Sequence, residues 1–228
     1  MPEAVPLRAV VFDAYGTLLD VHSATMRHAN RLGAGALAFS ADWRAKQLEY
    51  SWVRSLTGPT HHRDFWACTR DALAWTAARH DVTDPELLTA LLAAYRLLDA
   101  YPEVPAMLRA LRQRGLHTAI LSNGSPMMLA DATAGAGIAT LLDALLSVEA
   151  VGVFKPDRRV YALAEQRLGL APREMAFVSA NAWDTQAAHA AGFRAIRVNR
   201  QGAPDEYGLE AAGVPSIPDL AALPGLLA

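Results

Sequence analysis

The sequence predicts an α/β protein with a Rossmann-like, mostly parallel sheet as its core and a helical cap inserted after the first strand. Two observations indicate the core: short apolar runs closed by turn residues recur along the chain, and helical segments alternate with them. A third indicates the cap, because residues 21–97 show helical patterns and no convincing strand. We therefore expect the core at 1–20 and 98–228 and the cap at 21–97.

Five runs are expected to form the strands of the core. They are 8–14 (RAVVFDA), 117–123 (HTAILSN), 174–181 (EMAFVSAN) and, with a weaker pattern, 144–148 (ALLSV) and 194–199 (RAIRVN). Short apolar runs with β-branched residues are typical of strands buried in a parallel sheet.

Three segments between these strands, 104–115, 125–137 and 155–169, are expected to be helices. The first has apolar residues at a spacing near 3.6 and ends on Gly115, while the third ends on Gly169. The second begins with Ser125 as a candidate N-cap and Pro126 at the first helical position.

The expected cap is rich in tryptophan. Its main helical segments are 40–56 and 62–80, and four of the five tryptophans lie in it: Trp43, Trp52, Trp66 and Trp75. A cap that faced only water would not need so much apolar surface, so we expect two caps to pair in a homodimer.

Composition excludes several classes of protein. A net charge of -2 provides no basic field for nucleic acid or an anionic membrane. The N-terminus lacks a basic region followed by a long apolar stretch, and no segment approaches the length of a membrane span. Cys68 is the only cysteine, which rules out an intramolecular disulfide and a thiolate metal cluster. A cytoplasmic protein is expected.

Polar residues follow the ends of the predicted strands. They are Asp13, Ser122 with Asn123, and Ser179 with Asn181 and Asp184, while Lys155 enters from a loop before a helix. Ligands of an open parallel sheet bind beyond the carboxyl ends of its strands. Asp13 alone could be a turn former, but the four clusters together predict a site. We also expect backbone N–H groups at Gly16 and Thr17 to face an anion.

These residues resemble the four motifs of the haloacid dehalogenase superfamily, matched by Asp13, Ser122, Lys155 and Asp184. Five stretches, FDAYGTLLDVHS, WRAKQLEYSW, LSNGSP, FKPDRRVY and NAWD, are similar to the (S)-2-haloacid dehalogenases. The similarity covers about residues 8–200. It implies hydrolysis of a 2-haloalkanoic acid through a covalent ester on Asp13, releasing halide.

Two substitutions within the motifs separate this chemistry from that of the superfamily's phosphatases. Those enzymes carry a second acid two positions after the nucleophile, and another acid that holds Mg²⁺. Here Tyr15 and Ala180 stand in those places. An alkoxide leaving group needs a proton and a phosphoryl group needs a cation, whereas a halide leaves as a stable anion. We therefore expect neither a metal nor a cofactor.

The resemblance also implies a role for each site residue. Asp13 is the expected nucleophile, Lys155 its counter-charge and Thr17 its support. Asp184 is the expected general base, aided by Asn181 and Ser179, and Tyr161 donates to a carboxylate or to the substrate. The alternative for Asp184 is an N-cap for the helix that follows.

The remaining expected roles concern the substrate. Arg44 shares a helical stripe with Leu48 and Trp52 and is expected to accept the halide, unless it is a surface arginine with a packed stem. Ser122, Asn123 and the Ala14 N–H are expected to hold the substrate carboxylate, and Asn123 also to touch the halide. Tyr15, Leu48, Phe65 and Trp183 are expected to contact the substrate, the last three as an apolar wall.

Two other functions stay open on the sequence alone. One is a Mg²⁺-dependent small-molecule phosphatase, and the other is a binding protein that kept the fold. The natural substrate, its chain length and the preferred halogen, fluoride included, are not resolved.

Overall fold

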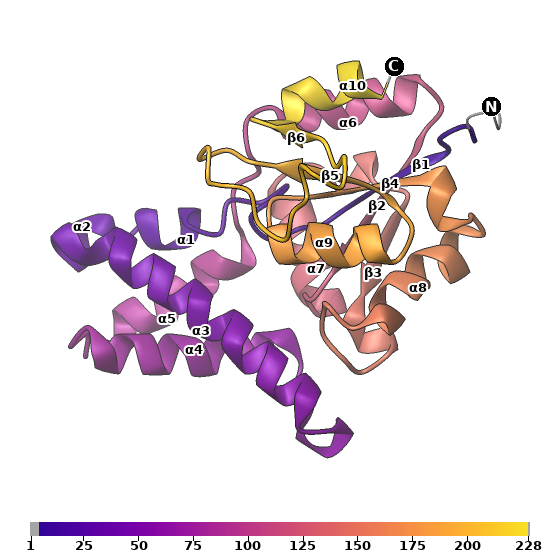
Figure 1. Ribbon diagram of the computed structural model, residues 1–228. Helices are drawn as coiled ribbons and strands as arrows, with labels where there is room; N and C mark the ends of the chain where they lie inside the picture. Colours follow the sequence, from indigo (N-terminus) through magenta and orange to yellow (C-terminus); the bar gives the residue numbers. More distant parts are fainter. Residues whose placement is uncertain (1–4, 228) are drawn as a thin grey trace.

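The computed structural model describes residues 5–227. One part of the molecule is a parallel sheet covered by helices, and a group of helices lies to one side of it (Figure 1). This is the predicted α/β architecture with a helical cap. The chain runs from one part to the other through two neighbouring segments, which pair at Leu19 and Ala100. The expected boundaries at residues 20 and 97 stay a prediction.

The sheet has six strands in the order β3-β2-β1-β4-β5-β6, all parallel. The strands are β1 (Ala9–Phe12), β2 (His117–Ser122), β3 (Ala144–Ser147), β4 (Met175–Ser179), β5 (Arg194–Val198) and β6 (Ser216–Ile217). The five predicted strands are confirmed. The two-residue β6 was not predicted, because so short a strand leaves no periodic pattern.

Helices connect the strands and cover both faces of the sheet. They are α6 (Val104–Gln113), α7 (Pro126–Gly135), α8 (Arg158–Leu168), α9 (Ala182–Ala190) and, after β6, α10 (Leu223–Leu226). Right-handed crossovers place the helix that follows β1 on one face and those that follow β3 and β4 on the other. Accordingly, α6 and α10 pack together above the sheet, and α8 and α9 lie below it (Figure 1).

The three predicted core helices are present with shifted ends. Gly115 and Gly169 have positive φ values of 75° and 65° at helix C-termini, as expected. The third helix starts at Arg158 rather than near residue 155, because Asp157 is its N-cap and accepts from the Arg159 N–H. Ser125 occupies the N-cap position of α7, but its side chain makes no capping hydrogen bond.

The cap contains α1 (Ser23–Met26), α2 (Ala29–Leu32), α3 (Ala36–Leu56), α4 (Phe65–Arg79) and α5 (Pro85–Arg96). Six short 3₁₀ turns complete the described chain: η1 (Gly33–Gly35), η2 (Pro59–His61), η3 (Ala139–Leu141), η4 (Val148–Ala150), η5 (Pro172–Glu174) and η6 (Leu220–Ala222). The long α3 packs along α4, where the Trp43 indole donates to the Thr69 carbonyl at 2.9 Å.

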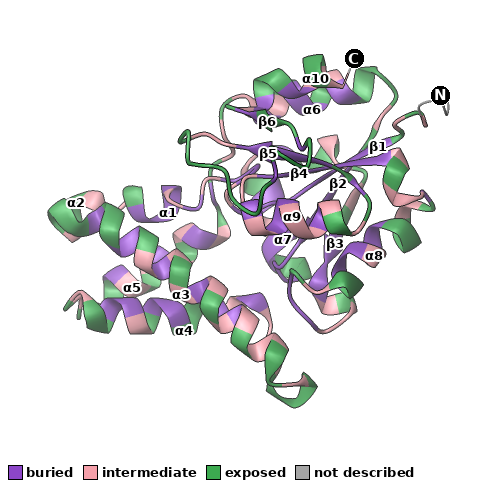
Figure 2. Ribbon diagram, in the orientation of Figure 1, coloured by how far each residue is buried: buried purple, intermediate pink, exposed green. Residues whose placement is uncertain are grey.

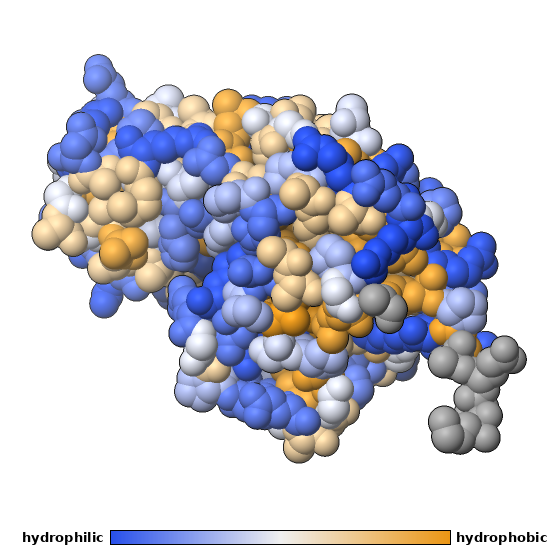
Figure 3. Space-filling model, turned by 90° about the horizontal axis from the view of Figure 1, so that it is seen from above, coloured by the Kyte–Doolittle hydropathy of each residue, from blue (hydrophilic) through white to orange (hydrophobic). Residues whose placement is uncertain are grey.

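One continuous apolar cluster joins the two parts. The central strands of the sheet are largely buried (Figure 2), and β1 is fully inaccessible at all four residues. Phe39, Trp43 and Leu91 of the cap belong to the same cluster as these strands. Seen from the side of α6 and α10, the surface carries hydrophobic residues in separate groups among hydrophilic ones (Figure 3). Within residues 5–227, no helix is long and apolar enough to cross a bilayer.

Candidate active site

Asp13 lies just beyond the carboxyl end of β1, where the sheet order reverses between β1 and β4. Its Oδ2 accepts from Asn181 Nδ2 at 2.7 Å, Thr17 Oγ1 at 3.2 Å and Ser179 Oγ at 3.5 Å. Its Oδ1 accepts from Lys155 Nζ at 3.2 Å. Four donors thus surround the buried Asp13 carboxylate and fix its position.

A tight turn after β1 sets the position of Thr17. Gly16, with φ 93°, allows the turn, and Thr17 Oγ1 accepts from the Ala180 N–H at 2.8 Å while donating to Asp13. The expectation that the Gly16 and Thr17 N–H groups face an anion is wrong. They donate to the Leu19 and Ala14 carbonyl oxygens inside the turn, at 2.7 and 3.3 Å.

Lys155 bridges two carboxylates in the interior. Its Nζ lies 2.7 Å from Asp184 Oδ2 as well as 3.2 Å from Asp13, and the side chain is only 1% exposed. Tyr161 donates to Asp184 Oδ1 at 2.6 Å. The three charges form one buried array, in which an ammonium is shared by two acids.

Asp184 is not a helix N-cap. Helix α9 begins at Ala182 with Asn181 at the cap position, so Asp184 lies in the first turn and points into the site. Asn181 and Ser179, expected to aid Asp184, instead donate to Asp13. The start of α9 therefore contributes two contacts to the site: Asp184 accepts from Lys155, and the N-cap residue Asn181 donates to Asp13.

Burial governs the protonation of this array. It raises the pKa of Asp184 to about 6, with the neighbouring Asp13 charge adding to the rise and Lys155 opposing it. Burial also raises the pKa of Tyr161 far above its ordinary value. Tyr161 therefore remains a hydrogen-bond donor, while Asp184 can exchange a proton in mildly acidic solution.

The loop after β2 closes another side of the site. Ser122 Oγ accepts from the Gly124 N–H at 3.1 Å, and Asn123 Oδ1 accepts from the Lys155 N–H at 2.9 Å. Both residues are buried. Asn123 thus fixes the backbone that carries Lys155, a contact that the sequence did not indicate.

Arg44 reaches the site from α3 of the cap. Its Nη2 donates to the Tyr15 carbonyl at 3.1 Å and its Nη1 to Gln47 Oε1 at 2.7 Å. No carboxylate of residues 5–227 lies within 4 Å of this half-buried guanidinium. Gln47, which also accepts from Tyr95, was not predicted as a site residue, since a buried glutamine on a helix resembles one on a solvated face.

Aromatic rings line the boundary between cap and core. The Tyr15 ring lies 5.9 Å from those of Phe65 and Tyr95, and its buried hydroxyl has no hydrogen-bond partner among residues 5–227. Trp183 meets Trp52 of α3 edge to face at 5.6 Å. Leu48 is half-buried on the same helix. Burial raises the pKa of Tyr15 well above its ordinary value, so its hydroxyl is neutral.

The residues present do not fit the Mg²⁺ site of the superfamily's phosphatases. The place of the second acid holds Tyr15, whose ring packs against the cap, and Ala180 offers only a backbone N–H, to Thr17. The two carboxylates of the site are already bridged by Lys155. Within the described chain, no group of three His, Cys, Asp or Glu side chains is placed to hold a metal ion.

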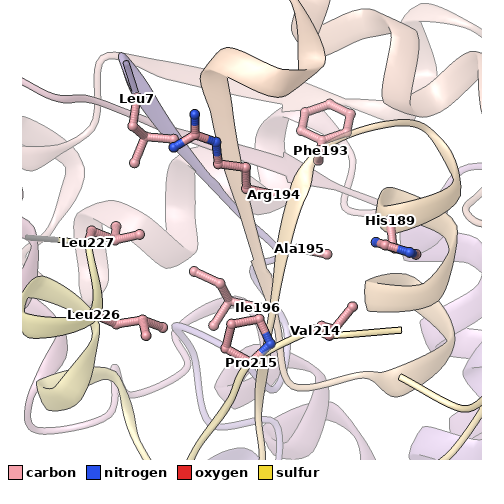
Figure 4. Close-up of a pocket in the computed structure, with 11 residues that line it drawn as sticks. Leu7, His189, Phe193, Arg194, Ala195, Ile196, Val214, Pro215, Leu226 and Leu227 are labelled. Atoms are coloured by element: carbon pink, nitrogen blue, oxygen red, sulfur yellow. The ribbon is translucent and has the colours of Figure 1, made fainter. Parts of the chain in front are cut away.

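A cavity lies at the other edge of the sheet from these residues, near the amino ends of the strands. It measures about 430 Å³ and is lined by Leu7 before β1, Arg194 and Ile196 of β5, and Leu226 near the C-terminus (Figure 4). Its lining is mainly apolar, with one arginine and His189 at the edge (Figure 4). The polar cluster around Asp13 is therefore the candidate active site.

Comparison with known proteins agrees with this geometry. Residues 7–192 match the family model of haloacid dehalogenase-like hydrolases. The chain belongs to this family. (S)-2-haloacid dehalogenase 4A of Burkholderia cepacia is 47% identical over 202 residues, which are 88% of this chain and 87% of that protein. (S)-2-haloacid dehalogenase 1 of Pseudomonas sp. (strain CBS-3) is 46% identical over 203 residues, 89% and 88% of the two chains.

Solved structures of the family superimpose on this hydrolase along its length. The L-2-haloacid dehalogenase of Xanthobacter autotrophicus with chloropropionic acid covalently bound has a TM-score of 0.84 at 37% identity. The alignment covers 97% of this chain and 98% of that one. The superposition includes the cap, so the inserted helices are part of the shared architecture.

Proposed function

We propose that this hydrolase converts small (S)-2-haloalkanoic acids into (R)-2-hydroxyalkanoic acids, without a metal, through a covalent ester on Asp13. The observation that carries the proposal is the set of partners on Asp13. An ammonium, two hydroxyls and an amide surround the carboxylate, while a tyrosine and an alanine replace the acids that phosphoryl transfer uses. The relatives named (S)-2-haloacid dehalogenases support the choice of substrate.

The first step is displacement at carbon. The Asp13 carboxylate attacks C2 from the side opposite the halogen, a C–O bond forms as the carbon–halogen bond breaks, and configuration inverts. A carboxylate is a weak nucleophile in water, but burial removes its hydration shell. Lys155, 3.2 Å away, is its counter-charge in the buried site.

The halide leaves with the bonding electron pair and meets Arg44. This guanidinium has only neutral partners, a carbonyl and an amide oxygen, so it can accept an anion without breaking an ion pair. Removing one such charge-stabilising donor typically costs about 3 to 4 kcal/mol of transition-state stabilisation. Phe65, Leu48 and Trp183 form the apolar wall around the alkyl group.

The substrate carboxylate is proposed to lie against the loop after β2. Ser122, Asn123 and the N–H of Ala14 are its donors, and the amino end of α7 adds a positive dipole. The buried Tyr15 hydroxyl is proposed to contact the substrate, and its lack of a protein partner among residues 5–227 supports this role.

Hydrolysis of the ester restores the enzyme. Asp184 takes a proton from water, and the hydroxide adds to the ester carbonyl of Asp13. The tetrahedral intermediate expels the alkoxide, which takes the proton from Asp184 and leaves as the 2-hydroxy acid, while the regenerated Asp13 carboxyl releases its own proton to solvent. Tyr161 and Lys155 hold Asp184 in place. Its raised pKa suits a general base in mildly acidic to neutral solution.

The test is mass spectrometry of the protein quenched during turnover of (S)-2-chloropropionate. A substrate-derived adduct on Asp13, with chloride release unaffected by EDTA, is the expected result. Asp13→Asn should form no adduct. Chloride release that requires Mg²⁺, or phosphate release from p-nitrophenyl phosphate that requires it, would contradict the proposal. Comparing fluoroacetate with chloroacetate would measure the halogen preference.

A further inference from the structure

A cavity of about 270 Å³ opens next to the candidate active site, between the cap and the carboxyl end of β5. Three arginines line it: Arg44, Arg197 and Arg200. Asn181, which donates to Asp13 at 2.7 Å, lines it as well. The cavity is therefore separated from the Asp13 carboxylate by a single side chain.

Arg197, on β5, carries a buried charge with incomplete compensation. The residue is 5% exposed, and its Nε has no acceptor among residues 5–227. Its Nη1 donates to the Pro204 carbonyl at 3.1 Å, and its single carboxylate partner, Glu206, is 3.5 Å away and half exposed. A buried guanidinium so weakly paired favours an additional anion.

The other two arginines add to this positive surface. Arg44 has no carboxylate within 4 Å in the described chain. Arg200 pairs with Glu103 and stacks at 3.7 Å on the Tyr101 ring, yet its Nε too lacks an acceptor among residues 5–227. Three arginines thus line the cavity, against one lining carboxylate, Glu206, while Glu103 pairs with Arg200 from outside the lining.

The neighbouring active site has a net negative charge, which opposes the approach of an anion. Asp13 and Asp184 are two negative charges, and Lys155 is one positive charge. An anionic substrate must approach this net negative array, and a halide must leave it. Both need a positive surface on the way.

We propose that the arginine-lined cavity is a second binding site for a small monovalent anion, occupied by the carboxylate of an arriving substrate or by the departing halide. The role of the site in turnover rests on the proposed function, whereas the binding of an anion does not. Arg197 is the residue that makes the site, and Glu206 is the counter-charge that weakens it.

A purely structural role for Arg197 predicts something different. In that case the side chain only ties down the loop through Pro204 and Glu206, and removing Glu206 would loosen the loop. An anion site predicts the opposite for Glu206→Gln, since losing the counter-charge strengthens the field on a bound anion. The two roles therefore differ in the sign of one effect.

The experiment measures chloride binding to the full-length protein by broadening of the ³⁵Cl NMR signal, with no turnover involved. Glu206→Gln should tighten chloride binding and Arg197→Met should weaken it, each by about fivefold. Arg197→Lys should retain binding close to that of the wild type, and the exposed Glu210→Gln serves as the matched control without effect. Displacement by acetate and by bromide then identifies the preferred anion, carboxylate or halide.

Equal chloride binding by the wild type, Arg197→Met and Glu206→Gln would overturn the proposal, as would weaker binding by Glu206→Gln. The failure of the proposed function is a separate result: no halide would be released from 2-chloropropionate, whatever the NMR signal shows. If both hold, Arg197→Met lowers kcat/KM at low salt and leaves kcat unchanged, and added salt narrows the difference.

Discussion

At the scale of single residues, the site is organised around one shared cation. Lys155 lies between Asp13 and Asp184, so each carboxylate depends on an ammonium that the other also attracts. Asp13 has three further donors, whereas Asp184 has only Tyr161 and is completely buried. The difference in donors separates the two acids: four donors hold the Asp13 carboxylate, whereas burial raises the pKa of Asp184 to about 6, so Asp184 can be protonated.

This difference predicts a pH dependence of the proposed reaction. Because the pKa of Asp184 is raised to about 6, the base becomes protonated, and turnover should fall, as the pH drops through that value. The stability contribution has the opposite sign, because the fold favours protonated Asp184 and loses that contribution as the pH rises through about 6. The measurement is kcat for chloride release from mildly acidic to neutral pH.

Two variants make the assignment specific. Asp184→Asn should slow ester hydrolysis by at least about a hundredfold and let the adduct on Asp13 accumulate. Asp81→Asn, at an exposed position with φ 54° that asparagine also adopts, should keep the wild-type profile. If Asp184→Asn remained active and its kcat still fell below about pH 6, the titrating group would be a residue other than Asp184.

At the scale of elements, the loop after β2 determines where Tyr15 can lie. A Cβ at Gly124 would come within 2.8 Å of Tyr15 Cε2 and 3.0 Å of Leu129 Cδ2. Because Gly124 has no side chain, the Tyr15 ring from the loop after β1 can pack against the backbone of the loop after β2.

Gly124→Ala should consequently destabilise the fold by about 1 to 3 kcal/mol and lower kcat/KM, since the added methyl forces the Tyr15 ring to move. Thermal unfolding and initial rates measure the two effects. Gly35→Ala is the matched control: its φ is -81° and nothing lies within 4 Å of the added Cβ. It should unfold at the same or a slightly higher temperature. Equal melting temperatures for the two variants would contradict the packing argument.

Most elements of the fold could be predicted because their signals are local. Apolar runs identified five strands, and Gly115 and Gly169 marked helix ends through their backbone preference. The position of Asp13 follows from the rule that strand ends share one edge of a parallel sheet, whereas Lys155, in the loop before α8, was assigned through the resemblance to the family motif. The sequence analysis expected Asn181 to act on Asp184, but its amide donates to Asp13. Asn181 is the N-cap of α9 and Asp184 lies in its first turn, so the two side chains point in directions that their order in the sequence does not indicate.

Other features depend on contacts between distant segments and leave no local pattern. Gln47 bonds to Thr69 and Tyr95 on two other cap helices, and Arg197 of β5 bonds to Pro204 and Glu206 in the loop that follows. The short β6 is defined by its pairing with β5 alone. Sequence periodicity could not have found these residues.

At the scale of the whole molecule, the cap carries a disproportionate share of exposed apolar surface. Among residues 5–227, five of the nine large hydrophobic side chains that are exposed lie between residues 21 and 97, about a third of the chain. Val53 and Leu56, 50% and 86% exposed, lie three residues apart on one face of α3. A second copy of the chain would cover such a face.

We therefore expect light scattering after gel filtration to give twice the 24.5 kDa mass of one chain. Replacing Val53 and Leu56 together by glutamate should reduce the mass to that of one chain, because four carboxylates would meet in the buried interface of a symmetric pair. Met127→Glu with Leu145→Glu, a matched pair at exposed positions of the core, should leave it doubled. A single-chain mass for the wild type would mean that the exposed face of α3 does not hold two caps together.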